Sequence, residues 1–128
     1  MPEILFAEES FKIIGACMTV HGTLGCGFYE AVYQEALEHE FESQDIPFSR
    51  QSKLRIRYND IQLDKYYVAD FVCYESIILE IKATPLLYDS QKFQLLNYLK
   101  ATGLELGMLI NFGEKSLNFK RLINTINI

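Results

Sequence analysis

Three ionisable residues, Asp70, Glu80 and Lys82, stand in two otherwise apolar stretches of the chain, A-D-F-V-C and I-I-L-E-I-K. Burying a charge among apolar residues is costly unless the charge is paired or bound to a metal ion. A pair of carboxylates suits a hard divalent cation such as Mg²⁺ or Mn²⁺, and a neighbouring amine could orient or deprotonate a water molecule. These residue types are those of a metal-dependent phosphodiesterase site.

The two stretches are expected to form one β-hairpin. Residues 65–73 and 77–83 are predicted to be strands, and the tight segment Tyr74-Glu75-Ser76 joins them. Both strands are apolar on both faces, which is typical of strands in the middle of a sheet that helices cover on each side.

The length of the hairpin loop decides whether the three side chains meet. With a three-residue loop, Asp70 lies opposite Glu80 at roughly 5 Å, and Lys82 shares their face. A two-residue loop would place Asp70 opposite Ile81 and send the carboxylates to opposite faces. Two carboxylates this close would repel each other unless a cation lay between them. The alternative is that the three residues form a structural ion pair or lie at strand ends in water.

Three helices are predicted from the periodicity of the apolar residues, at residues 8–21, 28–43 and 90–102. The third is expected to end at Gly103. The apolar faces predicted from the spacing consist of Phe11, Ile14, Cys17, Met18 and His21 in the first helix, Phe28, Val32, Ala36, Leu37 and Phe41 in the second, with Tyr33 and Glu40 beside them, and Phe93, Leu96 and Leu99 or Lys100 in the third.

The remaining elements are predicted to be strands. Residues 49–58 alternate apolar and basic side chains and precede a turn at Asn59-Asp60. Residues 106–112 are expected to be a buried strand, and residues 117–123 a last strand or short helix. The order is therefore ααβββαβ followed by a short final element, an α/β (α+β) fold, and residues 1–128 are expected to form a single domain.

The composition limits the class of protein. The 128 residues are 49% hydrophobic, and the three cysteines show no CxxC spacing, so neither a disulfide framework nor a zinc knuckle is indicated. No segment has the length of a membrane helix and the N-terminus lacks the basic start of a secretion signal, so a cytoplasmic location is expected. The net charge of −5 does not favour binding to a polyanion, although the local distribution of charge matters more.

The pattern D-x9-E-x-K across the hairpin resembles the PD-(D/E)XK nuclease superfamily, with Ala69 standing where the proline of that name would be. The segment G-F-Y-E-A-V-Y, with Gly27, Glu30 and Tyr33, is similar to the signature of the GxxExxY proteins. This resemblance continues through L-E-I-K-A, Q-L-L-N-Y-L-K-A-T-G and L-I-N-F-G, and it covers residues 21–123.

The resemblance implies a mixed central sheet flanked by helices and a nuclease that uses Mg²⁺ or Mn²⁺. It implies that Asp70 and Glu80 ligate the metal with help from the Ile81 carbonyl. It also implies that Lys82 acts on the attacking water and that Glu30 is a further metal ligand. Gln94 and Tyr98 match the Q-x-x-x-Y motif of the RecB-like branch, which implies that they point toward the site. Simpler alternatives are a solvated helix carboxylate for Glu30 and half-buried packing for Tyr98.

Four basic residues, Arg50, Lys53, Arg55 and Arg57, form a strip on the first predicted strand and could contact a phosphate backbone. Such a strip is otherwise the solvent face of an edge strand, where charge discourages aggregation. The expected partner is nucleic acid, with DNA ahead of RNA, and no membrane. Two alternatives stay open: a non-catalytic nucleic-acid-binding or protein-interaction module that keeps the fold, and a homo-oligomer that is active only when assembled.

Overall fold

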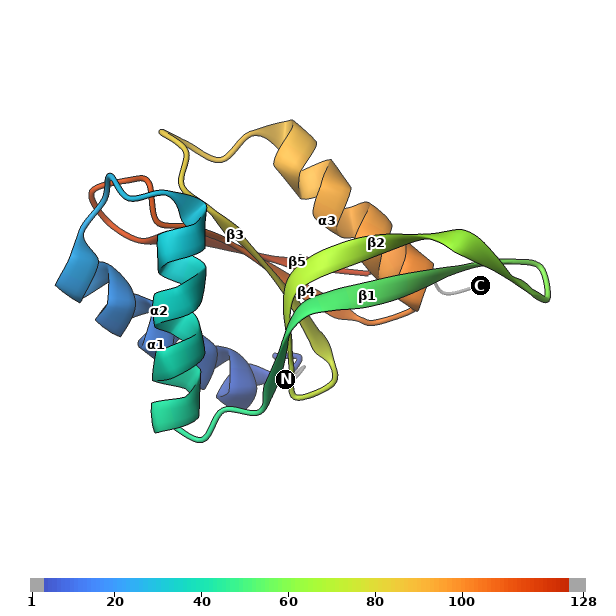
Figure 1. The fold of residues 1–128 in the computed structure, drawn as a ribbon, viewed down its shortest axis with the longest axis horizontal. Helices are drawn as coiled ribbons and strands as arrows, with labels where there is room; N and C mark the ends of the chain where they lie inside the picture. Colours follow the sequence, from blue (N-terminus) through green and yellow to red (C-terminus); the bar gives the residue numbers. More distant parts are fainter. Residues whose placement is uncertain (1–3, 125–128) are drawn as a thin grey trace.

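The computed structural model describes residues 4–124. It contains the helices α1 (Ala7–Leu24), α2 (Glu30–Ser43) and α3 (Asp89–Thr102), and the strands β1 (Phe48–Tyr58), β2 (Ile61–Cys73), β3 (Ile77–Lys82), β4 (Leu106–Asn111) and β5 (Asn118–Ile123) (Figure 1). The predicted order ααβββαβ is confirmed, and the final element is a strand.

The five strands form one mixed sheet in the order β1-β2-β3-β4-β5. Strands β3 and β4 are parallel, and the other neighbouring pairs are antiparallel. A parallel pair needs a crossover connection, and α3 provides it. The predicted mixed sheet flanked by helices is therefore confirmed.

Two apolar clusters lie on opposite faces of this sheet. Helices α1 and α2 pack on one face, against side chains that include Ile77, Leu79 and Ile81 of β3. Helix α3 packs on the other face, where Ile78 contributes to the core. Because side chains alternate along a strand, Glu80 and Lys82 belong to the same side of β3 as Ile78, toward α3.

The predicted apolar faces of the helices are wrong in part. The misplaced residues are Phe11 and Met18 of α1, Phe28 before α2, Val32 of α2, and Phe93 and Leu96 of α3, all of which are exposed. The predicted residues Cys17, His21, Leu37, Phe41 and Leu99, with Tyr33 beside them, are buried as expected. The helices also bury residues outside the predicted faces, namely Ile13, Ala16 and Val20 of α1, Gln34 of α2, and Leu95 and Tyr98 of α3. Each helix carries apolar residues on more than one side, so spacing alone does not select the face that meets the sheet.

Strand β2 is longer and less buried than predicted. It begins at Ile61 rather than at residue 65, and side chains from Tyr66 to Val68 are exposed, whereas Ala69, Phe71 and Cys73 are fully buried. The outer part of β2 and β1 project from the body as a long hairpin arm (Figure 1). The prediction that this strand lies in the middle of the sheet, buried on both faces, holds only near its C-terminal end at Cys73.

None of the helices within residues 4–124 is both long and apolar enough to cross a lipid bilayer.

Candidate active site

The hairpin of β2 and β3 has the register that the three-residue loop predicts. Cys73 pairs with Ile77, and Phe71 pairs with Leu79. The Ser76 N–H donates a hydrogen bond to the Cys73 carbonyl at 3.0 Å, which closes the loop. Asp70 and Glu80 are the next residues on the two strands, so they face each other as predicted.

Here the carboxylates take the place of the backbone ladder. The Asp70 N–H donates to Glu80 Oε2 at 2.8 Å, and the Ile81 N–H donates to Asp70 Oδ2 at 2.7 Å. Each carboxylate thus accepts a backbone N–H of the opposite strand at the point where β2 bends away from β3 into the arm (Figure 1). Backbone N–H groups that would otherwise lose their partners are satisfied, and both side chains are fixed.

Helix α2 brings a third acidic residue and an amide to this pair. Glu30 is the first residue of the helix, and Gln34 lies one turn later on the same face. Burial raises the pKa of Glu30 and the charge of Asp70 adds to this, while Lys82 and the Ala83 N–H oppose it. Glu30 is therefore near enough to Asp70 and Lys82 for their charges to act on its carboxyl group.

Gln34 lies next to the acidic pair, and the sequence analysis missed it. Its side chain is 7% exposed, its Oε1 accepts a hydrogen bond from Gln51 Nε2 at 2.8 Å, and its side chain lies near enough to Asp70 to favour the charged form of that carboxylate. The available signal was its position four residues after Glu30, which places it on the same helix face.

The acidic pair has unusual electrostatics. Burial raises the pKa of Glu80 to about 7, with the charges of Asp70 and Glu30 contributing, against the Asp70 N–H and Lys82. Burial also raises the pKa of Asp70, although the Ile81 N–H, Lys82, Arg50 and Gln34 all favour its charged form. Near neutral pH Glu80 is therefore partly protonated in the absence of a cation, and a cation bound to the pair would displace this proton.

Helix α3 supplies the remaining predicted residues. Lys82 Nζ donates a hydrogen bond to Gln94 Oε1 at 3.3 Å. Tyr98 is 8% exposed, and its ring lies 4.8 Å from that of Tyr67 between centroids. Burial raises the pKa of Tyr98 to about 12, and the charges of Glu80 and Asp70 add to the effect. Gln94 and Tyr98 thus lie on the Lys82 side of the site, and Tyr98 also has the packing role considered for it.

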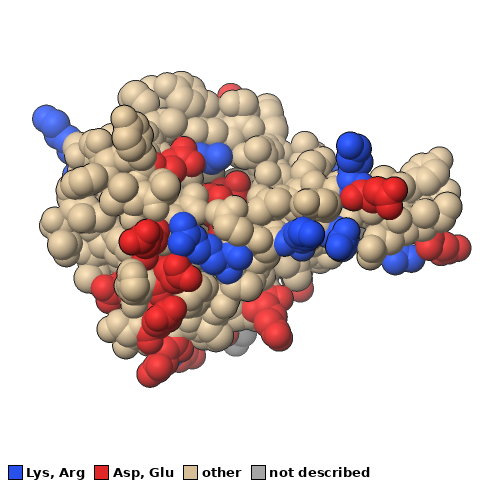
Figure 2. All heavy atoms as spheres, viewed as in Figure 1, with Lys and Arg blue, Asp and Glu red and all other residues tan. Residues whose placement is uncertain are grey.

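The four basic residues do not form one uniform strip. Arg50 Nη1 donates to Glu38 Oε1 at 2.9 Å, next to the site. Lys53 and Arg55 lie over the Tyr66 ring, and Arg57 donates to the Asp60 carbonyl. Gln51, between Arg50 and Lys53, has a left-handed φ of 52° within β1, and the pairing of β1 with β2 shifts register between Arg55 and Arg57. Figure 2 shows Lys and Arg side chains spaced along the hairpin arm, and acidic and basic groups side by side in the middle of the same face.

The donor atoms suit a hard divalent cation. Within residues 4–124, no three His, Cys, Asp or Glu side chains form a ready-made metal cluster. Mg²⁺ needs only one or two protein carboxylates, because it keeps several of its waters. Asp70 and Glu80 supply two carboxylates with raised pKa values, which fits an ion that would neutralise their repulsion.

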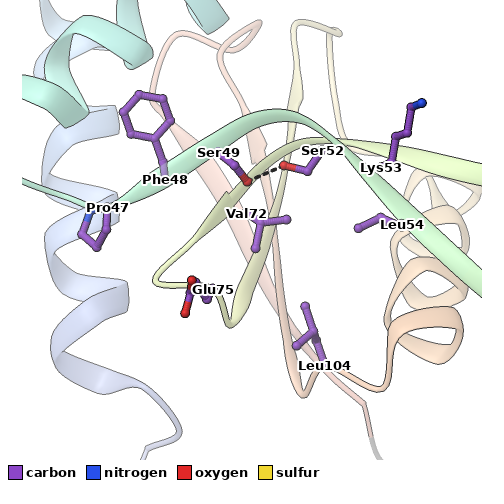
Figure 3. Close-up of a pocket in the computed structure, with 9 residues that line it drawn as sticks. All are labelled: Pro47, Phe48, Ser49, Ser52, Lys53, Leu54, Val72, Glu75 and Leu104. Carbon is purple, nitrogen blue, oxygen red and sulfur yellow. Dashed lines mark hydrogen bonds between the residues drawn. The ribbon is translucent and has the colours of Figure 1, made fainter.

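A separate pocket of about 520 Å³ lies under the base of the hairpin arm (Figure 3). Of the predicted site residues only Lys53 lines it, and in Figure 3 its amine points away from the other lining side chains. The pocket has a single carboxylate, Glu75, and a hydrogen bond joins the Ser49 and Ser52 hydroxyls. It lacks the paired acids found between β2 and β3.

Comparisons with known proteins agree with this fold. No curated protein sequence matches the chain. A crystal structure, that of SSO0001, superposes with a TM-score of 0.59 at 14% sequence identity, over 95% of this chain and 61% of that one. The similarity at this identity concerns the fold. The family model described as the PD-(D/E)XK nuclease superfamily matches residues 7–122. The chain belongs to the PD-(D/E)XK nuclease superfamily.

Proposed function

We propose that this protein hydrolyses phosphodiester bonds of nucleic acid with the help of Mg²⁺ or Mn²⁺, as a nuclease of the GxxExxY type. The observation that carries the proposal is the pair of carboxylates, Asp70 and Glu80, each held by a backbone N–H of the opposite strand beside the amine of Lys82. Two partly buried carboxylates this close together repel each other, and this repulsion destabilises the folded protein when no cation is bound. A purely structural role does not require such a pair.

In the proposed site, Asp70 and Glu80 hold the ion, and the Ile81 carbonyl and Glu30 are the further predicted ligands. When bound, the ion polarises the phosphate and lowers the pKa of a water molecule. Lys82 holds or moves the proton of the attacking water, and its hydrogen bond to Gln94 keeps the amine in place. Gln34 orients Asp70 through its side-chain amide.

The exposed basic residues of the arm serve in this proposal to bind the phosphate backbone. Lys53, Arg55 and Arg57 lie along β1 opposite residues 62–68 of β2, beyond the acidic pair, so their charge offsets the net charge of −5 locally. Arg50 pairs with Glu38, and its charge favours the charged form of Asp70, so in this proposal Arg50 acts at the acidic pair and not along the arm.

The decisive test measures cleavage of labelled single- and double-stranded DNA and RNA in Mg²⁺ or Mn²⁺. We expect Asp70→Asn and Lys82→Ala to lower the cleavage rate by roughly 100-fold or more, because each removes a group that acts on ion or water. The matched control is Asp45→Asn, an exposed aspartate after α2 whose left-handed φ of 57° asparagine also adopts.

Equal rates for wild type, Asp70→Asn and Asp45→Asn would refute the proposal. Mn²⁺ should also raise the melting temperature of the wild type and of Asp45→Asn, but not that of Asp70→Asn, because an ion that binds only the folded site stabilises it.

A non-catalytic binding module is the second candidate, and the net charge of −5 favours it. It predicts nucleic-acid or protein binding without ion-linked stabilisation. An enzyme active only as a homo-oligomer would instead show cleavage that depends on protein concentration, along with self-association in sedimentation.

A further inference from the structure

A second pocket lies beside the acidic pair, between α3 and the base of the hairpin arm. It encloses about 370 Å³ and is lined by Tyr67, Ser90, Phe93, Gln94, Asn97 and Tyr98. We call this set the aromatic pocket. Three of its side chains present rings, and the other three present hydroxyl or amide groups. No acidic side chain is among them.

The aromatic pocket shares two residues with the candidate active site. Gln94 accepts the hydrogen bond of Lys82 at 3.3 Å. Tyr98 lies near enough to Glu80 and Asp70 for their charges to act on its hydroxyl. A ligand in the pocket would therefore be a direct neighbour of the group that reacts at the acidic pair.

The exposure of its rings is not explained by packing. Phe93 is 63% exposed and Tyr67 is 37% exposed, although Leu95 and Leu99 of the same helix are fully buried in the core. The rings of Tyr67 and Tyr98 pack against each other at a tilt of 32°, with their centroids 4.8 Å apart, which fixes both rings at the wall of the pocket. Phe93 adds a ring on the solvent side of this wall.

These groups match the chemistry of a nucleobase. A base has two apolar π-faces, on which aromatic side chains stack, and an edge of hydrogen-bond donors and acceptors. The amides of Gln94 and Asn97 each carry both a donor and an acceptor, so they can pair with the edges of different bases. A base inside a duplex cannot enter such a pocket unless it leaves the stack.

We propose that the aromatic pocket binds an unpaired nucleobase next to the phosphate that is cleaved, so that the substrate is single-stranded nucleic acid or a frayed end. This inference rests on the proposed function for the identity of the neighbouring phosphate. Phe93 and Tyr67 hold the base by stacking, while the basic side chains of the arm hold the backbone that leads away from it.

The test uses oligonucleotides that carry one 2-aminopurine, whose fluorescence falls when it stacks, in EDTA so that no metal-dependent cleavage occurs. We expect quenching at one position of a single strand bound to the wild type, and loss of this quenching in Phe93→Ala. Phe93→Tyr should keep it. The matched control is Phe11→Ala, because Phe11 is an exposed phenylalanine on α1, remote from the pocket.

Affinity gives a second readout. Phe93→Ala should bind an intact single strand about 5- to 100-fold more weakly than the wild type does, which is the usual range for one stacked base. It should bind an abasic strand of the same length as tightly as the wild type does. Phe11→Ala should match the wild type on both strands. DNA and RNA of one sequence are compared in parallel to show which backbone is preferred.

The inference is overturned if Phe93→Ala and Phe11→Ala show the same quenching and affinity, or if intact and abasic strands bind the wild type alike. If the wild type still cleaves nucleic acid in that case, the proposed function stands alone. Stacking that depends on Phe93, without cleavage in any divalent ion, would support the base site and reject hydrolysis. A wild type that binds no oligonucleotide rejects both.

Discussion

The two halves of strand β2 have the same backbone conformation and opposite surroundings. The inner half, residues 69–73, pairs with β1 on one side and, from Phe71 onward, with β3 on the other, and it buries Ala69, Phe71 and Cys73 completely. The outer half, residues 61–68, pairs with β1 alone and exposes Ile61, Tyr66 and Val68. Only the inner half is part of the core, while the outer half is a surface.

Asp70 stands where one half becomes the other. At this residue β2 stops pairing with β3. The backbone N–H groups of Asp70 and Ile81 donate hydrogen bonds to the carboxylates of Glu80 and Asp70 instead. The candidate site thus lies at the border of the core. The acidic pair is buried enough there to raise the pKa of Glu80 to about 7, and exposed enough for the basic arm and α3 to lie beside it.

The largest difference between the halves should appear in stability. Phe71→Ala should lower the free energy of unfolding by about 3–5 kcal/mol, because it opens a cavity between rings of Phe41 and Phe48. Tyr66→Ala, in the outer half, should cost about 1 kcal/mol or less, since it loses mainly exposed contacts with Lys53 and Arg55. Urea denaturation measures both. Similar losses for the two variants would contradict the division of β2.

Glu80, at this border, should make the free energy of unfolding depend on pH. In the unfolded chain Glu80 has its ordinary pKa of 4.5, whereas in the folded, metal-free protein its pKa is about 7. Between these values the folded protein binds more protons than the unfolded chain. The free energy of unfolding should therefore fall as pH rises from 5 to 7, by at most about 1.4 kcal/mol per pH unit, and level off above pH 8.

Glu80→Gln should flatten this dependence, because glutamine cannot titrate but still offers an oxygen to the Asp70 N–H. Denaturation in EDTA at several pH values provides the measurement, with Glu75→Gln, an exposed loop residue, as the control. A Glu80→Gln profile as steep as that of the wild type would show that another group sets the slope.

The smallest effect is expected from the charges of the outer half. Lys53→Gln with Arg55→Gln should weaken nucleic-acid binding and lower the dependence of log affinity on log salt by roughly 1.4 to 1.8, because two phosphate contacts are lost. The free energy of unfolding should change little. The paired substitution Lys115→Gln with Lys120→Gln, on exposed residues distant in sequence from the arm, controls for net charge. If both double variants changed the dependence of log affinity on log salt equally, the arm would not be part of the nucleic-acid-binding surface.

The central part of the site could be predicted from the sequence. Two charges in apolar strands and a three-residue loop were enough to place Asp70 opposite Glu80, because the alternation of side chains leaves only two registers to choose between. The helix faces could not be predicted in the same way. Phe11 and Phe93 have the spacing of core residues and are exposed, since several faces of these helices are apolar.

Gln34 escaped prediction because a glutamine in a helix is usually solvated, and only its contacts with Asp70 and Gln51 show that it is buried. Tyr67 and Phe93 are 26 residues apart in the chain, and nothing in their spacing indicates that they line one pocket.

The sequence by itself determined the order of helices and strands, the register of the central hairpin and the acidic pair, because these depend on local periodicity and on the length of one loop. The tertiary structure alone decided how far β2 extends beyond the sheet, which face of each helix is buried, and that α2 and α3 reach the pair from two sides. Those features depend on packing between segments distant in the chain, where burial of apolar surface selects one arrangement among several that the local pattern allows.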